Sequence, residues 1–89
     1  KALEGEGRDF WIEDVSAATE NLLLAAHALG LGAVWTGVYP STERTKAVQE
    51  RLGLPATIIP LAVVPIGYPV APQQPKDKYT PANIHFNRW

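Results

Sequence analysis

The stretch WIEDVSAATENLLLAAHALGLGAVWTGVYP (residues 11–40) decides what this chain can fold into. Its first two thirds carry apolar side chains at spacings of three and four, which places them on one face of a helix. These positions are Val15, Ala18, Leu22, Ala25 and Leu29. Leucine and alanine also fill much of the remaining circumference, and a helix that is apolar nearly all round is buried or pressed between layers or subunits. The pattern therefore predicts a buried helix near residues 15–29.

The ends of this helix have their own signals. Asp14 is placed to cap the first turn, because a carboxylate accepts hydrogen bonds from the free amides there. Gly30 is the expected stop, since glycine adopts the left-handed conformation after a helix without a steric penalty. Residues 1–10 are polar and predict a loop. His27, a lone histidine among apolar residues, favours a structural role over a catalytic one.

Shorter elements follow the helix. Residues 33–39 contain β-branched and aromatic side chains between glycine and proline, and they predict a short strand. Ser41 and Gly53 bracket an amphipathic helix over residues 42–52, in which Ala47, Val48 and Leu52 would face inward.

The second apolar run, residues 57–67, predicts a core strand from Leu61 to Ile66. Pro60 and Pro65 cannot donate to a ladder and must lie at a strand start, a bulge or an edge. Residues 70–89 are rich in proline and predict an extended tail, whose Phe86 and Trp89 need a surface to cover them, for which a neighbouring subunit is one candidate. The fold class is therefore α+β.

Composition limits the functions that remain. The chain has 89 residues, 46% of them hydrophobic, with eight Lys and Arg, nine Asp and Glu, and no cysteine. A net charge of −1 gives no field that would attract nucleic acid or an acidic membrane surface. The sequence shows no thiolate site, no metal-ligand spacing, no hydrolase motif, and no apolar run of the roughly 18 residues that a membrane span needs. Gly30-Leu31-Gly32-Ala33 is not a dinucleotide fingerprint, because it follows a helix and lacks the third glycine. The start at Lys1 indicates a piece of a longer protein, and the lack of a visible targeting signal favours the cytoplasm.

The order of the motifs is more informative than any one of them. WIEDVSAATENLLLAAHALGLGAVWTGVYP, RLGLPATIIPLAVVPIGYP and QPKDK, taken together over residues 9–80, resemble the carboxy-terminal half of proteins of the nitroreductase family. That resemblance implies an FMN-dependent α/β sandwich of which residues 1–89 form the carboxy-terminal part of one domain. It also implies a homodimer with FMN at its interface and NAD(P)H as the electron donor. The acceptors would be nitroaromatics, quinones or similar small molecules, reduced by ping-pong hydride transfer through flavin N5.

The resemblance also assigns residues. Trp35, Thr36 and Gly37 match the segment that passes beside the flavin ring, where a backbone amide faces N5 and Gly37 permits close approach. Lys76 and Lys78 match the basic pair that contacts the FMN phosphate, although lysine stands at the second position where many relatives have arginine. Side chains two apart in an extended segment point the same way, so both ammonium groups can meet one anion. Trp11 is a further candidate, near the substrate channel.

Two interpretations of function remain open from the sequence. The family's amino-terminal half supplies further strands and phosphate ligands that are missing here, so the chain alone is not expected to bind flavin or turn over. The resemblance assigns no catalytic side chain and no metal. The alternative is a non-catalytic dimerisation or interaction module, which uses the apolar helix as its surface and the tail as an arm. The two differ at Lys76 and Lys78, which should meet Gly37 at one pocket only in the flavoprotein.

Overall fold

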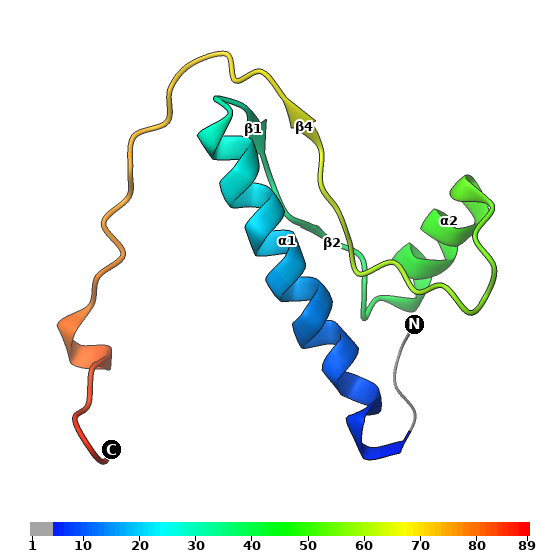
Figure 1. Ribbon diagram of the computed structural model, residues 1–89, viewed down its shortest axis with the longest axis horizontal. Helices are drawn as coiled ribbons and strands as arrows, with labels where there is room; N and C mark the ends of the chain where they lie inside the picture. The colour runs from blue at the N-terminus through cyan, green and yellow to red at the C-terminus, as the bar shows by residue number, and fades with distance from the viewer. Residues whose placement is uncertain (1–4) are drawn as a thin grey trace.

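The computed structural model describes residues 5–89, and it is an α+β arrangement as the sequence predicts. Two helices and four very short strands make up the body, and an extended tail leaves it (Figure 1). The elements in chain order are the 3-10 helix η1 (Gly5–Asp9), α1 (Phe10–Ala28), β1 (Gly32–Ala33), β2 (Thr36–Gly37), α2 (Thr42–Leu52), β3 (Ala62–Val63), β4 (Ile66–Gly67) and the 3-10 helix η2 (Pro81–Asn83).

Helix α1 begins at Phe10, before the expected start, and the prediction of Asp14 as its cap is wrong. The cap position is Asp9, which makes no side-chain capping hydrogen bond. The 3-10 helix η1 runs directly into α1, so carbonyl groups of that turn can serve the first amides in place of a side chain. The predicted loop is therefore helical from Gly5 onward, while its first four residues lie outside the described part of the chain.

The other helix ends follow the sequence signals. Gly30 has a φ of 73°, and Leu31 N–H donates to the Ala26 carbonyl at 2.9 Å. At the start of α2, the Ser41 hydroxyl oxygen accepts from the Arg44 N–H at 3.3 Å, as an N-cap should. At its end, Gly53 has a φ of 63°. Local chemistry alone therefore accounts for the end of α1 and for both ends of α2.

The four strands form one interrupted antiparallel ribbon. β1 pairs with β4 through Gly32–Gly67 and Ala33–Ile66. β2 pairs with β3 through Thr36–Val63 and Gly37–Ala62. All of these pairs share a single register, so the two segments predicted as single strands are each split in the middle rather than rearranged.

Pro65 explains the interruption. Hydrogen-bonded pairs alternate along an antiparallel ladder, and the Val38 N–H bond to the Leu61 carbonyl, 3.0 Å long, sets their phase. In that phase residue 65 should donate to the carbonyl of Val34, and proline has no N–H to give. The single missing donor unpairs residues 34 and 35 from 64 and 65.

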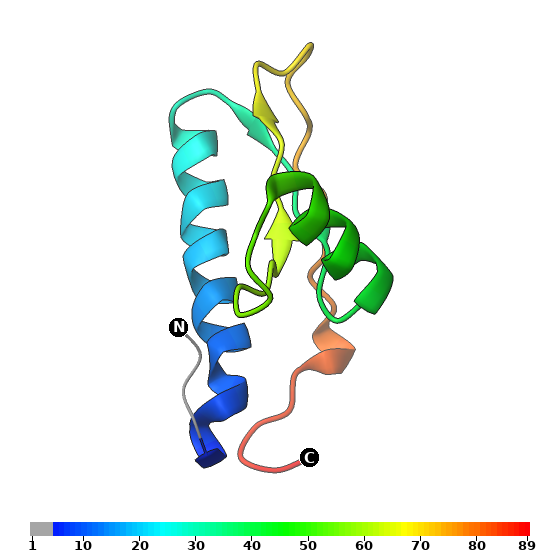
Figure 2. The ribbon, with the colours of Figure 1, turned by 90° about the vertical axis from the view of Figure 1, so that its right-hand side faces the viewer.

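Helix α1 runs alongside the ribbon but is not buried by this chain (Figure 2). Among its residues, all of which the structure describes, Ala26 alone is buried, whereas Phe10 and Leu24 are 56% and 59% exposed. The buried helix expected from the sequence is therefore not found in the isolated chain. One ribbon two strands wide covers one flank of the helix, and no second layer is present among residues 5–89.

Helix α2 is left open in the same way. Ala47, Val48 and Leu52 face a common apolar cleft of about 520 Å³ together with Val63 of β3. They share one face of α2 as predicted, but they are not buried: nothing in the described chain fills the cleft, and Leu52 remains 66% exposed.

The tail turns away from the body after β4 (Figure 1). It is extended apart from η2, as expected, and Phe86 and Trp89 are 82% and 95% exposed. The whole chain has an accessible surface of 8072 Å², compared with about 5,100 Å² for a compact folded monomer of this size. Its radius of gyration is 17.0 Å, compared with about 12 Å for a compact domain. The chain therefore has the surface of part of a domain rather than of a closed one.

Replacing Pro65 by valine in the full-length protein should join the two halves of the ribbon. The new N–H would donate to the Val34 carbonyl, and it should exchange with solvent at least roughly tenfold more slowly than a free loop amide, the worth of one hydrogen bond. The net effect on the free energy of unfolding should be within about 1 kcal/mol, because one hydrogen bond is gained while a stiff residue is lost from the unfolded chain.

Hydrogen exchange at position 65 of the Pro65→Val variant measures this change. Pro60→Val is the control, since Pro60 lies outside the paired segments. Rapid exchange of the amide introduced at position 65 would contradict this explanation of the break in the ribbon.

Candidate functional site

Gly37 presents an unpaired backbone amide at the edge of the ribbon. Thr36 and Val38 belong to hydrogen-bonded pairs, so Gly37 between them belongs to a non-hydrogen-bonded pair with Ala62. Both its N–H and its C=O therefore point away from β3. The carbonyl has a partner, but no partner within residues 5–89 takes the N–H. A donor that is held rigidly by its strand and left free is suited to bind a ligand acceptor.

The carbonyl of Gly37 is held by the side chain of Arg44. Arg44 Nη1 donates to it at 3.2 Å, across the turn between β2 and α2. A methyl group built at Gly37 would meet no other heavy atom within 4 Å, so the face of the ribbon there is open. A flat group could therefore approach Gly37 from this face, while the Arg44 guanidinium occupies part of the edge.

Trp35 and Thr36 lie beside that open edge. Trp35 is 36% exposed, so it is not a core aromatic packed away beside the long helix. It shares a face of the ribbon with Gly37, because side chains two apart in a strand point the same way. Thr36 lies between them on the opposite face and is exposed.

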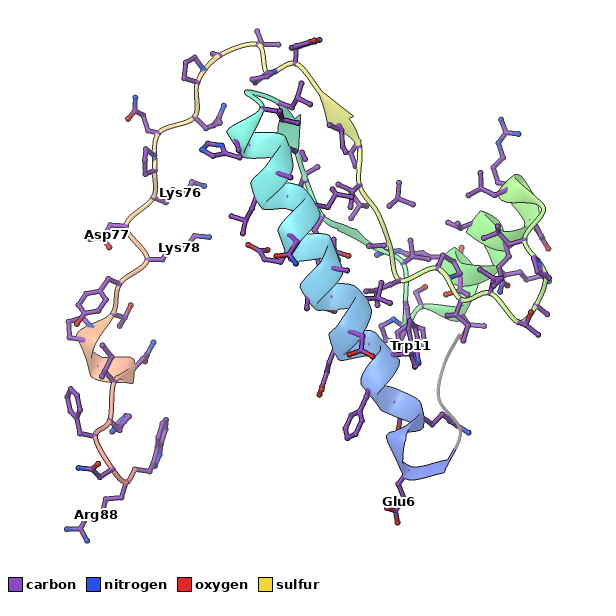
Figure 3. The ribbon with its side chains drawn as sticks, viewed as in Figure 1. Glu6, Trp11, Lys76, Asp77, Lys78 and Arg88 are labelled. Carbon is purple, nitrogen blue, oxygen red and sulfur yellow. The ribbon has the colours of Figure 1, made fainter. Side chains whose placement is uncertain are left out.

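Trp11 reaches the same region from the start of α1 (Figure 3). Its ring packs edge-on against Tyr39, with the ring centroids 5.0 Å apart and the planes at 69°. Such edge-to-face pairs contribute about 0.5–1.5 kcal/mol beyond the area they bury. The contact ties the first turn of α1 to the residues that follow β2, and so it places Trp11 close to the Gly37 edge.

Lys76 and Lys78 form a basic pair on one side of the tail. Figure 3 shows their side chains pointing the same way and Asp77 pointing to the opposite side. The Asp77 carboxylate accepts from the Tyr79 N–H at 2.9 Å, which occupies it within the tail. Neither lysine makes an ion pair with any carboxylate of residues 5–89. Two ammonium groups on one side of the tail, with the Asp77 carboxylate on the opposite side, are suited to an anion.

The structure does not bring the lysine pair to Gly37. The tail carries Lys76 and Lys78 away from the ribbon (Figures 1 and 3). The cleft under α2 and the cleft beside the end of α1 include neither of these lysines, nor Trp35, Thr36 or Gly37.

The nearest part of the tail, from Pro69 to Gln73, instead lines a cleft of about 530 Å³ beside the end of α1. His27 also lines this cleft and is exposed. Its predicted place in a buried helix is therefore wrong for the single chain.

Two other kinds of feature are absent over residues 5–89. No group of three or more His, Cys, Asp or Glu side chains is arranged to hold a metal ion. No helix in this range combines the length and the apolar character that crossing a membrane requires.

Sequence reasoning missed Arg44 and Tyr39 as parts of this region. In the sequence, Arg44 is one of several charged residues of the amphipathic helix over residues 42–52. A signal was present, because the first turn of a helix favours anions and an arginine there needs a reason. Tyr39 carried no such signal, since only the fold brings it to Trp11.

Known proteins are similar to this chain in sequence and in fold. The model of the nitroreductase family matches residues 3–68, and the chain belongs to that family. A protein of Methanothermobacter thermautotrophicus, described as a putative NADH dehydrogenase/NAD(P)H nitroreductase, is 46% identical over 80 residues, which are 90% of this chain and 42% of that protein. A protein of Archaeoglobus fulgidus with the same description is 49% identical over 84 residues, or 91% and 48% of the two chains.

Solved structures agree with this assignment. The structure of a putative NADH dehydrogenase/NAD(P)H nitroreductase from Parabacteroides distasonis superposes with a TM-score of 0.88 at 52% identity, over 91% of this chain and 48% of that one. An FMN-dependent nitroreductase from Clostridium difficile gives a TM-score of 0.83 at 30% identity, over 91% and 51%. The chain therefore spans about half the length of the relatives it matches.

Proposed function

We propose that the whole protein is an FMN-dependent NAD(P)H oxidoreductase, and that this chain supplies one side of its flavin site. Family membership and the descriptions of the relatives support the reaction class. The observation that carries the proposal is the free, rigidly held amide of Gly37 at an open strand edge. A fixed donor beside the redox-active edge of a flavin tunes the cofactor without supplying chemistry of its own.

The donors of this chain fit two parts of FMN. The Gly37 N–H would bind the ring edge at N5, while Trp35 and Thr36 would frame the ring on either side of the strand. Lys76 and Lys78 would bind the phosphate, since their ammonium groups share one side of an extended segment. When bound, FMN supplies the hydride chemistry, passing electrons from NAD(P)H to a small acceptor such as a nitroaromatic or a quinone in a ping-pong cycle. The chain's own residues orient and hold FMN, and none of them is needed as an acid or a base.

The remaining parts of the site belong to the other half of the domain and to a second subunit. We infer that residues 1–89 form the carboxy-terminal part of one domain and that residues 70–89 act as an arm onto a partner subunit in a homodimer. The accessible surface of 8072 Å², the open apolar cleft under α2 and the exposed rings of the tail support this. Fragment inactivity follows, because the chain alone keeps the lysine pair apart from Gly37. The cytoplasm, where NAD(P)H is available, is the proposed location.

The separation of Lys76 and Lys78 from Gly37 is also what a non-catalytic interaction module would show. In that alternative, α1 is a dimerisation surface and the tail is an arm without a ligand. Relatives described as nitroreductases favour the flavoprotein, and the spectrum of the intact protein separates the two.

The full-length protein should be yellow and should bleach when reduced nicotinamide is added without oxygen. Visible absorption spectra of the full-length protein and of residues 1–89 are compared before and after anaerobic NADPH, and then NADH. A flavin band in the first and none in the second would support the proposal and show that the other half completes the site. A colourless full-length protein that takes up no added FMN would favour the interaction module.

Removal of the Gly37 donor should weaken the flavin complex. Gly37→Pro deletes an N–H that makes no ladder bond, so the ribbon should survive, whereas Gly37→Ala keeps the N–H and adds a methyl group that meets nothing within 4 Å. FMN affinity of the full-length apoprotein should fall roughly three- to tenfold in the proline variant, the worth of one hydrogen bond. Quenching of flavin fluorescence measures it. Equal affinities for the proline and alanine variants would exclude the amide as a ligand.

The lysine pair should distinguish FMN from riboflavin, which lacks the phosphate. Lys76→Gln with Lys78→Gln should weaken FMN binding by at least roughly tenfold, because charge-assisted bonds to phosphate contribute about 1.5–3 kcal/mol each. Riboflavin affinity should not change. Lys46→Gln is the matched control, an exposed lysine on α2 that lies 3.8 Å from Glu50. A parallel loss for both ligands would show that the pair acts on folding rather than on the phosphate.

A further inference from the structure

Arg44 occupies a place that ordinarily disfavours a cation. It lies in the first turn of α2, where the helix dipole is positive, and its N–H is already used by the Ser41 cap at 3.3 Å. Its guanidinium forms no ion pair with any carboxylate of residues 5–89. Instead it turns back along the chain to the Gly37 carbonyl at 3.2 Å. The positive charge of Arg44 is thus kept near the positive end of the α2 dipole by a hydrogen bond to the neutral Gly37 carbonyl. This unfavourable position indicates that the charge has a role.

The register of the ribbon defines where that charge lies. In a non-hydrogen-bonded pair, the N–H and the C=O of one residue point to the same edge of the strand. The guanidinium on the Gly37 carbonyl therefore lies on the same edge as the free Gly37 N–H. A guanidinium has about five N–H donors, of which one is used there, and the others have no partner among the described residues. Any group that accepts from the Gly37 amide consequently lies beside the positive charge of Arg44, an exposed residue whose guanidinium is held there by this one hydrogen bond.

We propose that Arg44 is a positioning residue for the flavin site, which holds the Gly37 edge and places a positive charge beside the flavin ring. This inference rests on the proposed FMN function. Reduction adds negative charge to the ring, and a preorganised cation close to it stabilises the reduced state more than the oxidised one. Arg44 thereby raises the midpoint potential of the bound FMN.

The test uses the full-length flavoprotein and three substitutions of Arg44, to glutamine, methionine and lysine. Dye-equilibrated anaerobic titration gives the midpoint potential of the bound FMN. Arg44→Gln and Arg44→Met, which are neutral, should each lower the ratio of reduced to oxidised flavin by about tenfold, equal to about 30 mV for a two-electron couple. Arg44→Lys keeps the charge and should stay near the unaltered protein. Arg51→Gln is the matched control, because it removes the same charge from an exposed position on the same helix.

The outcomes separate this inference from the function on which it rests. A full-length protein without FMN contradicts the proposed function itself. Stoichiometric FMN with the same potential in Arg44→Gln, Arg44→Met and Arg51→Gln overturns the role of Arg44 and leaves the function intact. An equal drop in Arg44→Lys would also overturn it, because the charge would then not be the cause. Thermal unfolding of each apoprotein checks the fold, and Arg44→Met, which keeps much of the aliphatic stem, gives the result if the glutamine variant does not fold.

Discussion

The register between residues 32–38 and 61–67 is the constraint on which the rest of this structure depends. It pairs the segment that follows α1 with the segment that follows α2, and it decides which backbone amides are used in the ladder. Because pairing alternates along antiparallel strands, a slip of one residue would bury the Gly37 amide in the ladder and exchange the two faces of the strand. The free amide, the carbonyl that Arg44 holds and the open face of Gly37 all follow from this one alignment.

The apolar faces that the described residues leave uncovered are as informative as the register. Helix α1 carries apolar side chains around much of its circumference, yet among the described residues only a ribbon two strands wide packs beside it. Helix α2 in turn faces an unfilled apolar cleft. Exposing this much apolar surface is costly in water, so these faces need a complementary layer. The chain covers only 42% of one relative, whose remaining length leaves room for such a layer. Without that layer the chain stays open, with a radius of gyration of 17.0 Å.

The two candidate ligand elements differ in how they are held. Gly37 is fixed by a ladder, by Arg44 and, through Tyr39, by the packing of Trp11. Lys76 and Lys78 lie on an extended segment. Within residues 74–80, the hydrogen bond that involves a side chain is the one from the Tyr79 N–H to the Asp77 carboxylate, and it does not tie the segment to the body. Ordering such a segment costs conformational entropy, which a bound anion or a partner surface must offset. The Gly37 amide is therefore held in place within this chain, whereas the positions of Lys76 and Lys78 depend on what the tail packs against.

The sequence by itself determined the features whose causes lie within a few residues. Four features could be predicted directly from the sequence. They are the Ser41 cap, the left-handed conformation of Gly30 and Gly53, the helical periods, and the conflict between Pro65 and a continuous strand. Tertiary structure decided the rest. Asp14 failed as a cap because a preceding turn extended the helix, and α1 is exposed because burial depends on a layer distant in sequence. The resemblance to the family named Gly37 from the sequence, but only the register shows that its amide is left out of the ladder and that the Arg44 side chain reaches its carbonyl. Which amide a strand leaves free is set by the strand opposite and not by the residue itself.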